Sequence, residues 1–271
     1  MYASNFEYDG RLLSDLGFIV CRFDGAGSDD VEKGSELSFE LASARNGARK
    51  YAAGASYKNT LSTTFQICKD PDFYKASEME VTNEEFRMLG RWLNRSEFLW
   101  FRSFDHCEPE KKKPWFRASF TLSRIQIDGT TYGVELEMTT DSPFGYGDEI
   151  TNELSFRSGS MSAVITDKSD EIGDTYPEVT VTCRATGDLT LTDDITGCSC
   201  EIRNCHNGEI ITMSGETMII TASRVTHDVA NDFNYDFFHF GNTFDETRNT
   251  ITASLACDVE LRYRPIWKDT L

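Results

Sequence analysis

The stretch DSPFGYG, residues 141–147, separates two β-rich halves of a 271-residue chain. Upstream of it, apolar and polar residues alternate as in a β-hairpin, and downstream the sequence restarts as a series of short strand candidates. A chain of this length can form one large β domain or two ordinary ones, and the break favours two. We therefore expect one domain at residues 1–145 and a second at residues 146–271.

Negative charge is concentrated in the second half. Residues 1–141 carry 18 Lys and Arg against 23 Asp and Glu, and the remainder carries 9 against 22, for a net charge of −18. Nucleic acids and anionic membranes are bound largely through basic side chains, so we expect no sequence-specific nucleic-acid binding and no membrane association. The absence of an apolar run of about 18 residues and of a secretion signal predicts a soluble protein that folds in a cytoplasm.

Eight cysteines in a chain without an export signal are expected to be reduced thiols packed in the interior. Cys198, Cys200, Cys205 and His206 place four potential zinc ligands within nine residues. Structural zinc sites generally use ligand pairs two to four residues apart on separate turns, which this spacing does not match. We therefore interpret these residues as core and turn positions and expect no metal.

One helix is predicted in the first half, at residues 82–94. Thr82 and Glu85 have the spacing of a capping box, and Val81 and Phe86 have that of a hydrophobic staple. The apolar stripe that follows comprises Phe86, Leu89, Trp92 and Leu93. A stripe of this kind packs on a hydrophobic core, so we expect a helix lying on a sheet.

A β-hairpin precedes the break. Residues 116–122 alternate in polarity, the apolar set then shifts to Ile125 and Ile127, and Asp128-Gly129 forms a turn before the return strand at residues 132–138. The shift predicts a β-bulge or a bend in the strand. Further strands are expected at residues 6–8, 18–23 and 98–101, whereas the glycines at 25–27 and the lysines at 111–113 are interpreted as surface loops.

The second half repeats short strand candidates about ten residues apart, which indicates a β-sandwich or jelly roll. The candidates are residues 160–166, 178–183, 188–191, 198–203, 209–213 and 217–221. Residues 251–263 read as one long strand that suits the middle of a sheet.

The segment 231–240 is rich in aromatic residues, among them Phe233, Tyr235 and Phe237, which could stack on a sugar or contact a partner. The favoured alternative is that they plug the sandwich or a contact between subunits.

We find no residues arranged for catalysis. The sequence has no G-x-S-x-G nucleophile elbow and no H-E-x-x-H zinc helix, and the acidic loop at residues 167–174 lacks the spacing of an EF-hand. Any pair among the 45 acidic residues could be proposed as the two catalytic carboxylates of a glycosidase, so their number alone is no evidence for such an enzyme. We expect no enzyme, no catalytic residue and no cofactor.

The order of several motifs along the chain resembles the distal tail proteins of long-tailed bacteriophages. They are F-x-Y-D-G at residues 6–10, V-T-N-E-E-F through W-L at 81–93, S-P-F-G-Y-G at 142–147, T-Y-P-E-V-T-V at 175–181, the aromatic stretch at 237–240, N-T-I at 249–251 and R-Y-R at 262–264. Each motif is weak alone, and their shared order and spacing carry the resemblance.

The resemblance implies a structural protein of the virion tail tip. In this family an N-terminal β-sandwich domain with one helix and a projecting hairpin closes into a six-membered ring, and a galectin-like jelly roll lies outside it. The ring joins the tail tube to the tail-tip protein and in some phages anchors receptor-binding proteins. The present chain would then be assembled in the host cytoplasm, and it lacks the long carbohydrate-binding insertions of some members. Its expected roles are those of a homohexameric adaptor, with Pro143, Gly145 and Gly147 as the structural hinge between the domains.

Two other functions stay open from sequence. A monomeric carbohydrate-binding module would use the jelly roll and its aromatic segment. A glycan-cleaving enzyme would use two of the many carboxylates.

Overall fold

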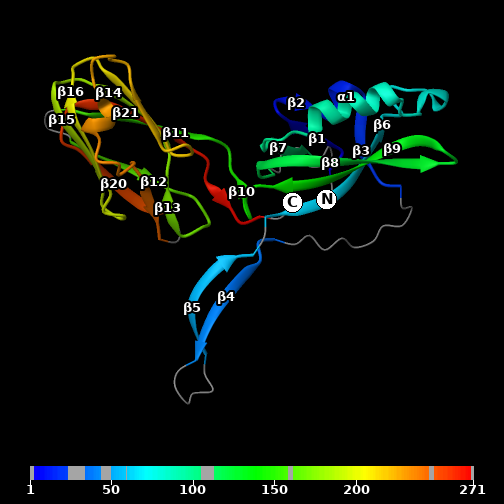
Figure 1. The fold of residues 1–271 in the computed structure, drawn as a ribbon, viewed down its shortest axis with the longest axis horizontal. Coiled ribbons are helices and arrows are strands. Elements are labelled where there is room, and N and C mark those ends of the chain that lie inside the picture. The colour runs from blue at the N-terminus through cyan, green and yellow to red at the C-terminus, as the bar shows by residue number, and fades with distance from the viewer. Residues whose placement is uncertain are drawn as a thin grey trace. The chain divides into compact units, whose positions relative to one another are not determined.

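The computed structural model describes residues 3–23, 34–43, 50–58, 60–104, 113–157, 161–243 and 247–269. They form two compact units, one of Met1–Tyr146 with Lys268–Leu271 and one of Gly147–Trp267 (Figure 1). The glycines expected in a loop at 25–27 and the lysines at 111 and 112 lie outside the described residues.

The first unit is built on one antiparallel sheet of seven strands. In spatial order these are β2 (Arg11–Leu12), β1 (Asn5–Tyr8), β7 (Leu99–Phe104), β8 (Phe116–Ile127), β9 (Thr130–Thr140), β6 (Ser62–Lys69) and β3 (Phe18–Cys21). The two ends of the sheet approach each other, since the Val20 N–H of β3 donates to the carbonyl of Ser4, the residue before β1, at 3.0 Å. The β8–β9 pairing stays in register from Leu122 to Ile125, where the bulge or bend was predicted, and shifts only between Ile125 and Gln126, with the extra residue on β9. Short 3-10 turns form at Leu13–Leu16 and Ala76–Glu78.

Helix α1 (Asn83–Leu93) lies over this sheet (Figure 1). Its capping box is formed as predicted: the Thr82 hydroxyl accepts from the Glu85 N–H at 3.2 Å and a Glu85 carboxylate oxygen accepts from the Thr82 N–H at 2.8 Å. The helix buries Leu89, Trp92 and Leu93. The Trp92 ring stacks on Phe6 at 5.7 Å between centroids, and its indole N–H donates to the Tyr8 carbonyl at 3.1 Å. This packing fixes the helix on the core.

Strands β4 (Leu37–Ser43) and β5 (Lys50–Tyr57) form a separate two-stranded hairpin (Figure 1). The sequence did not identify these strands, although the resemblance implied a projecting hairpin in this domain. The hairpin at residues 116–138 is instead part of the seven-stranded sheet.

The second unit is a β-sandwich. Its larger sheet has the order β11 (Ile150–Phe156), β21 (Cys257–Tyr263), β14 (Glu178–Cys183), β17 (Ile210–Ser214) and β18 (Ile219–Ala222). Its smaller sheet has the order β12 (Ser162–Thr166), β20 (Arg248–Ala253), β15 (Gly187–Asp193) and β16 (Ser199–Cys205). Strands β13 (Gly173–Thr175) and β19 (Phe240–Asn242) pair separately, and α2 is a single turn at Val229–Asp232. The two-residue strand β22 (Ile266–Trp267) also belongs to this unit, whereas the two-residue strand β10 (Gly145–Tyr146) belongs to the first. The mainly β prediction with two β domains is confirmed.

The prediction of one long strand at residues 251–263 is wrong. Strand β20 pairs in the four-stranded sheet and β21 in the five-stranded sheet, and the chain changes sheets between Ala253 and Cys257. The alternation continues across the break because Ile251, Ala253, Cys257 and Val259 all point into the interior of the same sandwich. Polarity alone therefore cannot reveal the change of sheet.

Candidate assembly surface and a cysteine, aspartate and histidine cluster

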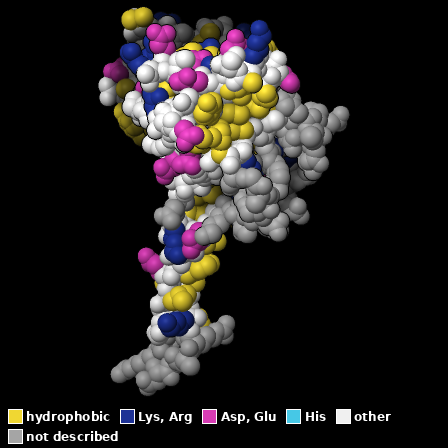
Figure 2. Space-filling view, turned by 90° about the vertical axis from the view of Figure 1, so that its right-hand side faces the viewer, with side chains coloured by type: hydrophobic (Ala, Val, Ile, Leu, Met, Phe, Trp, Pro, Cys, Tyr) yellow, Lys and Arg dark blue, Asp and Glu magenta, His cyan; other side chains and the backbone are white. Residues whose placement is uncertain are grey.

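The β4–β5 hairpin has an exposed apolar face. Alternation along β4 places Leu37, Phe39 and Leu41 on one side, and Phe39 and Leu41 are each 56% exposed. Cross-strand pairing adds Tyr57, Ala55 and Ala52 to the same side, with a bulge at Glu40/Leu41. Hydrophobic side chains follow much of the hairpin's length in Figure 2. We call this set the apolar hairpin face.

The base of the hairpin is attached to residues 143–144. The Tyr57 ring meets the Phe144 ring edge to face at 4.6 Å, and the Ser35 hydroxyl donates to the Pro143 carbonyl. A 2.7 Å ion pair between Lys58 and Glu36 adds a polar link between the two ends of the hairpin. The segment expected to act as a hinge therefore also supports the hairpin.

From the sequence we expect Gly145 and Gly147 to permit the turn at this segment, and the structure gives a different reason for them. Neither Gly145 nor Gly147 has a positive φ, so the turn does not demand them. A Cβ at Gly145 would lie 2.6 Å from the Pro114 side chain, and a Cβ at Gly147 would lie 2.8 Å from those of Pro265 and Trp267. Close packing excludes a side chain at both positions. That Pro143, Gly145 and Gly147 act as a hinge stays a prediction.

The aromatic segment after α2 divides into buried and exposed rings. Phe233 is buried, Phe237 is half-buried against the sandwich core, and Tyr235 is 68% exposed at a positive φ of 62°. The Phe233 ring lies 4.9 Å from Phe237 and 5.5 Å from Tyr235. The favoured interpretation, a plug in the sandwich, fits Phe233. Contact with a glycan or a partner stays a prediction, and of these three rings Tyr235 is the most exposed.

Polar side chains of the same segment bond to strand β16. The Asn234 amide donates to the Ser199 carbonyl at 2.7 Å, and its oxygen accepts from the Glu201 N–H at 3.1 Å. Asp236 accepts from the Ser199 N–H at 3.0 Å. Strand β16 is the last of its sheet, and these bonds cover part of its edge.

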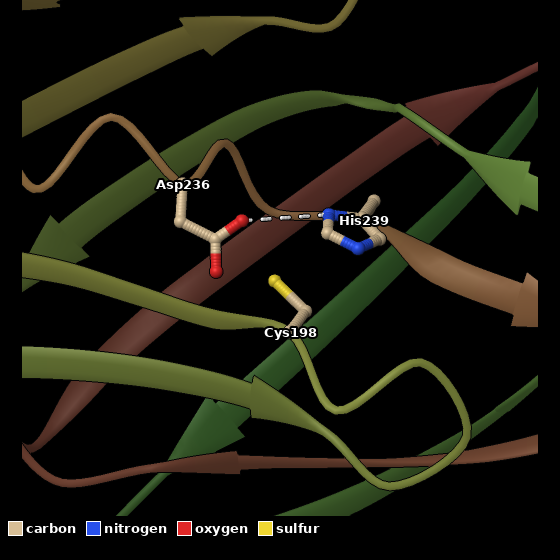
Figure 3. Close-up of side chains that lie close together, drawn as sticks. All are labelled: Cys198, Asp236 and His239. Carbon is tan, nitrogen blue, oxygen red and sulfur yellow. Dashed lines mark ion pairs between the residues drawn. The ribbon is translucent and has the colours of Figure 1, made fainter.

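This arrangement brings Asp236 and His239 beside Cys198, the residue before β16 (Figure 3). Ligand atoms of the three side chains all lie within 4.8 Å of one another. The Asp236 carboxylate is 3.9 Å from Nδ1 of His239, and that nitrogen lies 2.8 Å from the Phe237 carbonyl. We refer to Cys198, Asp236 and His239 as the CDH cluster. Asp236 and His239 follow Cys198 by 38 and 41 positions, so the spacing of residues in the sequence did not reveal the cluster.

The four residues considered as zinc ligands from sequence have different surroundings. The Cys200 sulfur lies 3.7 Å from the Met213 sulfur, the Cys205 thiol lies 3.4 Å from the Ile202 carbonyl, and the His206 ring lies 3.8 Å from Glu209. The seven described cysteines are free thiols. Of the four residues, only Cys198 belongs to the CDH cluster.

The acidic loop at residues 167–174 is tied into the second unit. Asp167 is fully buried, and one of its carboxylate oxygens accepts from the hydroxyl and the N–H of Ser169. Burial raises the pKa of this carboxyl despite those bonds. The Asp170 N–H donates to the Ile266 carbonyl at 2.8 Å, and the Asn242 amide donates to the Ser169 carbonyl. Hydrogen bonds of Asp167, Ser169 and Asp170 therefore hold the loop within the second unit.

Comparisons with known proteins identify the family. A family model described as a phage tail protein N-terminal domain matches residues 1–142, and one described as a phage tail C-terminal domain matches residues 144–263. No curated protein matches the sequence. None of the helices formed by the described residues has the length and hydropathy needed to cross a membrane.

Among solved structures, the chain is similar to the Dit protein (gp 19.1) of phage SPP1. The two are 12% identical with a TM-score of 0.64, and the match covers 96% of this chain and 98% of that chain. That structure is described as a paradigm of the hub adsorption apparatus in phages that infect Gram-positive bacteria. At this identity the likeness concerns the fold, and it agrees with the resemblance to distal tail proteins. Because the two family models together span nearly all of the sequence, the chain belongs to the phage tail protein family.

Proposed function

We propose that the protein is the hub of a phage tail tip, a homohexameric ring that joins the tail tube to the tail-tip protein. The apolar hairpin face is the observation that carries this proposal. An isolated two-stranded hairpin is marginally stable in water, and additional strands or a packed face are needed to hold it. Leu37, Phe39 and Leu41 expose large side chains on a hairpin of this kind. A neighbouring copy that covers them would stabilise the hairpin and close a ring.

The free energy available from burying the apolar hairpin face supports an assembly role. Burying one large apolar side chain contributes roughly 1.5–3 kcal/mol, so the three large residues of one hairpin can contribute several kcal/mol to each contact. The edges of β4 and β5 also carry backbone groups that can pair with another strand. Likeness to the SPP1 hub over nearly the whole of both chains is consistent with this use of the fold.

The remaining partners follow from the same proposal. The tail tube protein and the tail-tip protein would contact the ring formed by the first units, and receptor-binding proteins are candidate ligands of the second units. We assign the chain no catalytic role and place it in the virion tail after assembly in the host cytoplasm. A carbohydrate-binding module is the weaker alternative, since of the three aromatic residues considered for stacking Phe233 is buried and Phe237 is half-buried, which leaves Tyr235.

Mutation of the apolar hairpin face tests the proposal. We expect the native chain to form rings of six in negative-stain images, alone or with the tail tube protein, and Phe39→Asp to abolish them by placing a charge in the contact. The matched control is Ala42→Asp, which adds the same charge to the opposite face of the same strand. A native chain that stays monomeric with the tube protein and binds glycans would contradict the hub. Rings formed equally well by Phe39→Asp would exclude the hairpin from the contact.

A further inference from the structure

The CDH cluster combines three kinds of metal-ligand atom at one point of the second unit. Cys198 offers a sulfur, Asp236 a carboxylate oxygen and His239 a ring nitrogen, all within 4.8 Å of one another (Figure 3). Cys198 lies just before β16, whereas Asp236 and His239 lie in the irregular segment between α2 and β19. Ligands from two separate segments are typical of sites that fasten one part of a fold to another.

Each side chain is oriented by a second contact. One oxygen of Asp236 is fixed by the Ser199 N–H at 3.0 Å, and the other faces His239 at 3.9 Å. Nδ1 of His239 lies 2.8 Å from the Phe237 carbonyl, a contact that holds the ring in place. The Tyr176 ring covers the imidazole at 4.8 Å between centroids. Hydrogen bonds from a histidine ring to a backbone carbonyl commonly orient metal-binding histidines.

The spacing is close to that of a zinc site. Zinc binds sulfur at about 2.3 Å and nitrogen or oxygen at about 2.0–2.2 Å, so two ligands of one tetrahedral ion lie about 3.4–3.6 Å apart. Closing the cluster from 4.8 Å therefore needs side-chain movements of about 1 Å. Cys198 is 2% exposed, and the Asp236 side chain is 41% exposed, so an ion has a route from solvent.

A bound ion would change the state of the Cys198 sulfur, because a coordinating thiol loses its proton to solvent as the metal–sulfur bond forms.

We propose that Cys198, Asp236 and His239 bind one Zn²⁺ ion, with a solvent molecule as the fourth ligand. The mixed sulfur, nitrogen and oxygen donors favour zinc over calcium or magnesium, which prefer oxygen alone. The ion fastens the aromatic segment at residues 233–239 to the start of β16 and so strengthens the cover over the edge of the smaller sheet. This fastening is the only role that the proposal assigns to the ion, and the proposal does not depend on the hub function.

Cobalt substitution tests the proposal directly. Titration of the full chain with Co²⁺ is expected to give one equivalent of bound ion, a sulfur-to-cobalt charge-transfer band and the intense visible bands of a tetrahedral site. Cys198→Ser is expected to remove the charge-transfer band and to weaken Zn²⁺ binding by more than about tenfold, since even outer partners of metal ligands contribute 10–100-fold. Cys21→Ser, a thiol change in the other unit, is the matched control and should leave both signals unchanged.

Two further measurements guard against a folding defect. Asp236→Asn and His239→Gln alter less buried ligands and should also weaken Zn²⁺ binding, with circular dichroism spectra like that of the native chain. Zn²⁺ should raise the thermal unfolding midpoint of the native chain and not that of Cys198→Ser. Absence of the charge-transfer band in the native chain overturns the proposal, as does a band that persists in Cys198→Ser.

Discussion

Gly145 shows how a close approach between distant residues fixes one residue type. A Cβ there would lie 2.6 Å from Pro114 and 3.1 Å from Phe116, and both neighbours are buried. We expect Gly145→Ala to lower the free energy of unfolding by about 1–3 kcal/mol, because the buried neighbours must shift. Urea denaturation of the full chain measures this.

Gly90 is the matched control for that change. It lies within helix α1, where nothing would come within 4 Å of an added Cβ. Gly90→Ala should therefore raise the free energy of unfolding by about 0.5–1 kcal/mol through helix propensity. If both changes had the same sign, packing at Gly145 would not be the cause.

Asp258 links three neighbours on the surface of the second unit. Its carboxylate accepts from the Ser155 hydroxyl at 2.7 Å and from Arg184 at 2.7 Å, and it pairs with Arg157. The hydrogen bond from Ser155, followed by those from the two arginines, lowers the pKa of Asp258 from 3.8 to about 2.

Asp258→Asn is therefore predicted to have a pH-dependent effect. Because the folded-state pKa lies below the unfolded one, the ionised carboxylate stabilises the fold above about pH 4, and this contribution disappears as pH falls through 2. The arginines are half-exposed, so we expect a loss of roughly 1 kcal/mol near pH 7 after solvent screening. Denaturation at several pH values should show the gap between native and variant closing below pH 4. A gap that persists to pH 2 would contradict the assignment, and Glu260→Gln on the same strand serves as the control.

Helix α1 is fastened to the sheet by one ion pair at its first turn. The Lys69 ammonium of β6 lies 2.8 Å from Glu85 and donates to the Glu78 carbonyl at 3.0 Å, and its side chain is 5% exposed. Glu85→Gln keeps an oxygen for the capping box and removes the charge, so it isolates the ion pair. We expect it to reduce the free energy of unfolding by about 1–3 kcal/mol, since Lys69 stays buried without its carboxylate.

Glu84→Gln provides the comparison for this ion pair. It removes a charge from the same helical turn at an exposed position, and its effect should stay within about 0.5 kcal/mol. Chemical denaturation of both variants measures the difference. Equal losses would mean that charge near the helix terminus, rather than Lys69, determines the effect.

Elements with local signals were predictable from the sequence. The capping box and the Asp128-Gly129 turn depend on residues close together in the chain, and both are formed. The change of sheet at residues 254–256 was missed because polarity reports which face is buried and not which strand is the partner. The β4–β5 hairpin was missed although its signals are local, since Leu37, Phe39 and Leu41 alternate with other residues and Asn46-Gly47 follows them in the sequence.

Sites assembled from distant segments could not be predicted from the sequence, because a local pattern does not show which segments become neighbours in the fold. Four potential zinc ligands lie close together in the sequence, at Cys198, Cys200, Cys205 and His206. Strand alternation and turns give these side chains different surroundings in the fold. The partners of Cys198 are instead brought to it by the bonds of Asn234 and Asp236 to β16. Such a pairing depends on the course of the chain after α2, which no local pattern encodes.

At the scale of the whole molecule, charge and the apolar hairpin face have opposing effects on assembly. Each chain has a formal net charge of −18, so copies brought together in a ring repel one another. Leu37, Phe39 and Leu41 favour association by an apolar contact that salt does not screen. The balance between the two should therefore depend on ionic strength.

Raising the salt concentration is predicted to promote the ring. Between about 0.05 M and 0.5 M, the Debye length falls from about 14 Å to about 4 Å, which screens repulsion between exposed carboxylates of neighbouring copies. Mass photometry at fixed protein concentration should show the hexamer fraction rising over this range, while Phe39→Asp stays monomeric throughout. A ring that dissociates as salt is added would mean that ion pairs between copies hold it together, and the contact would then have to be sought outside the apolar hairpin face.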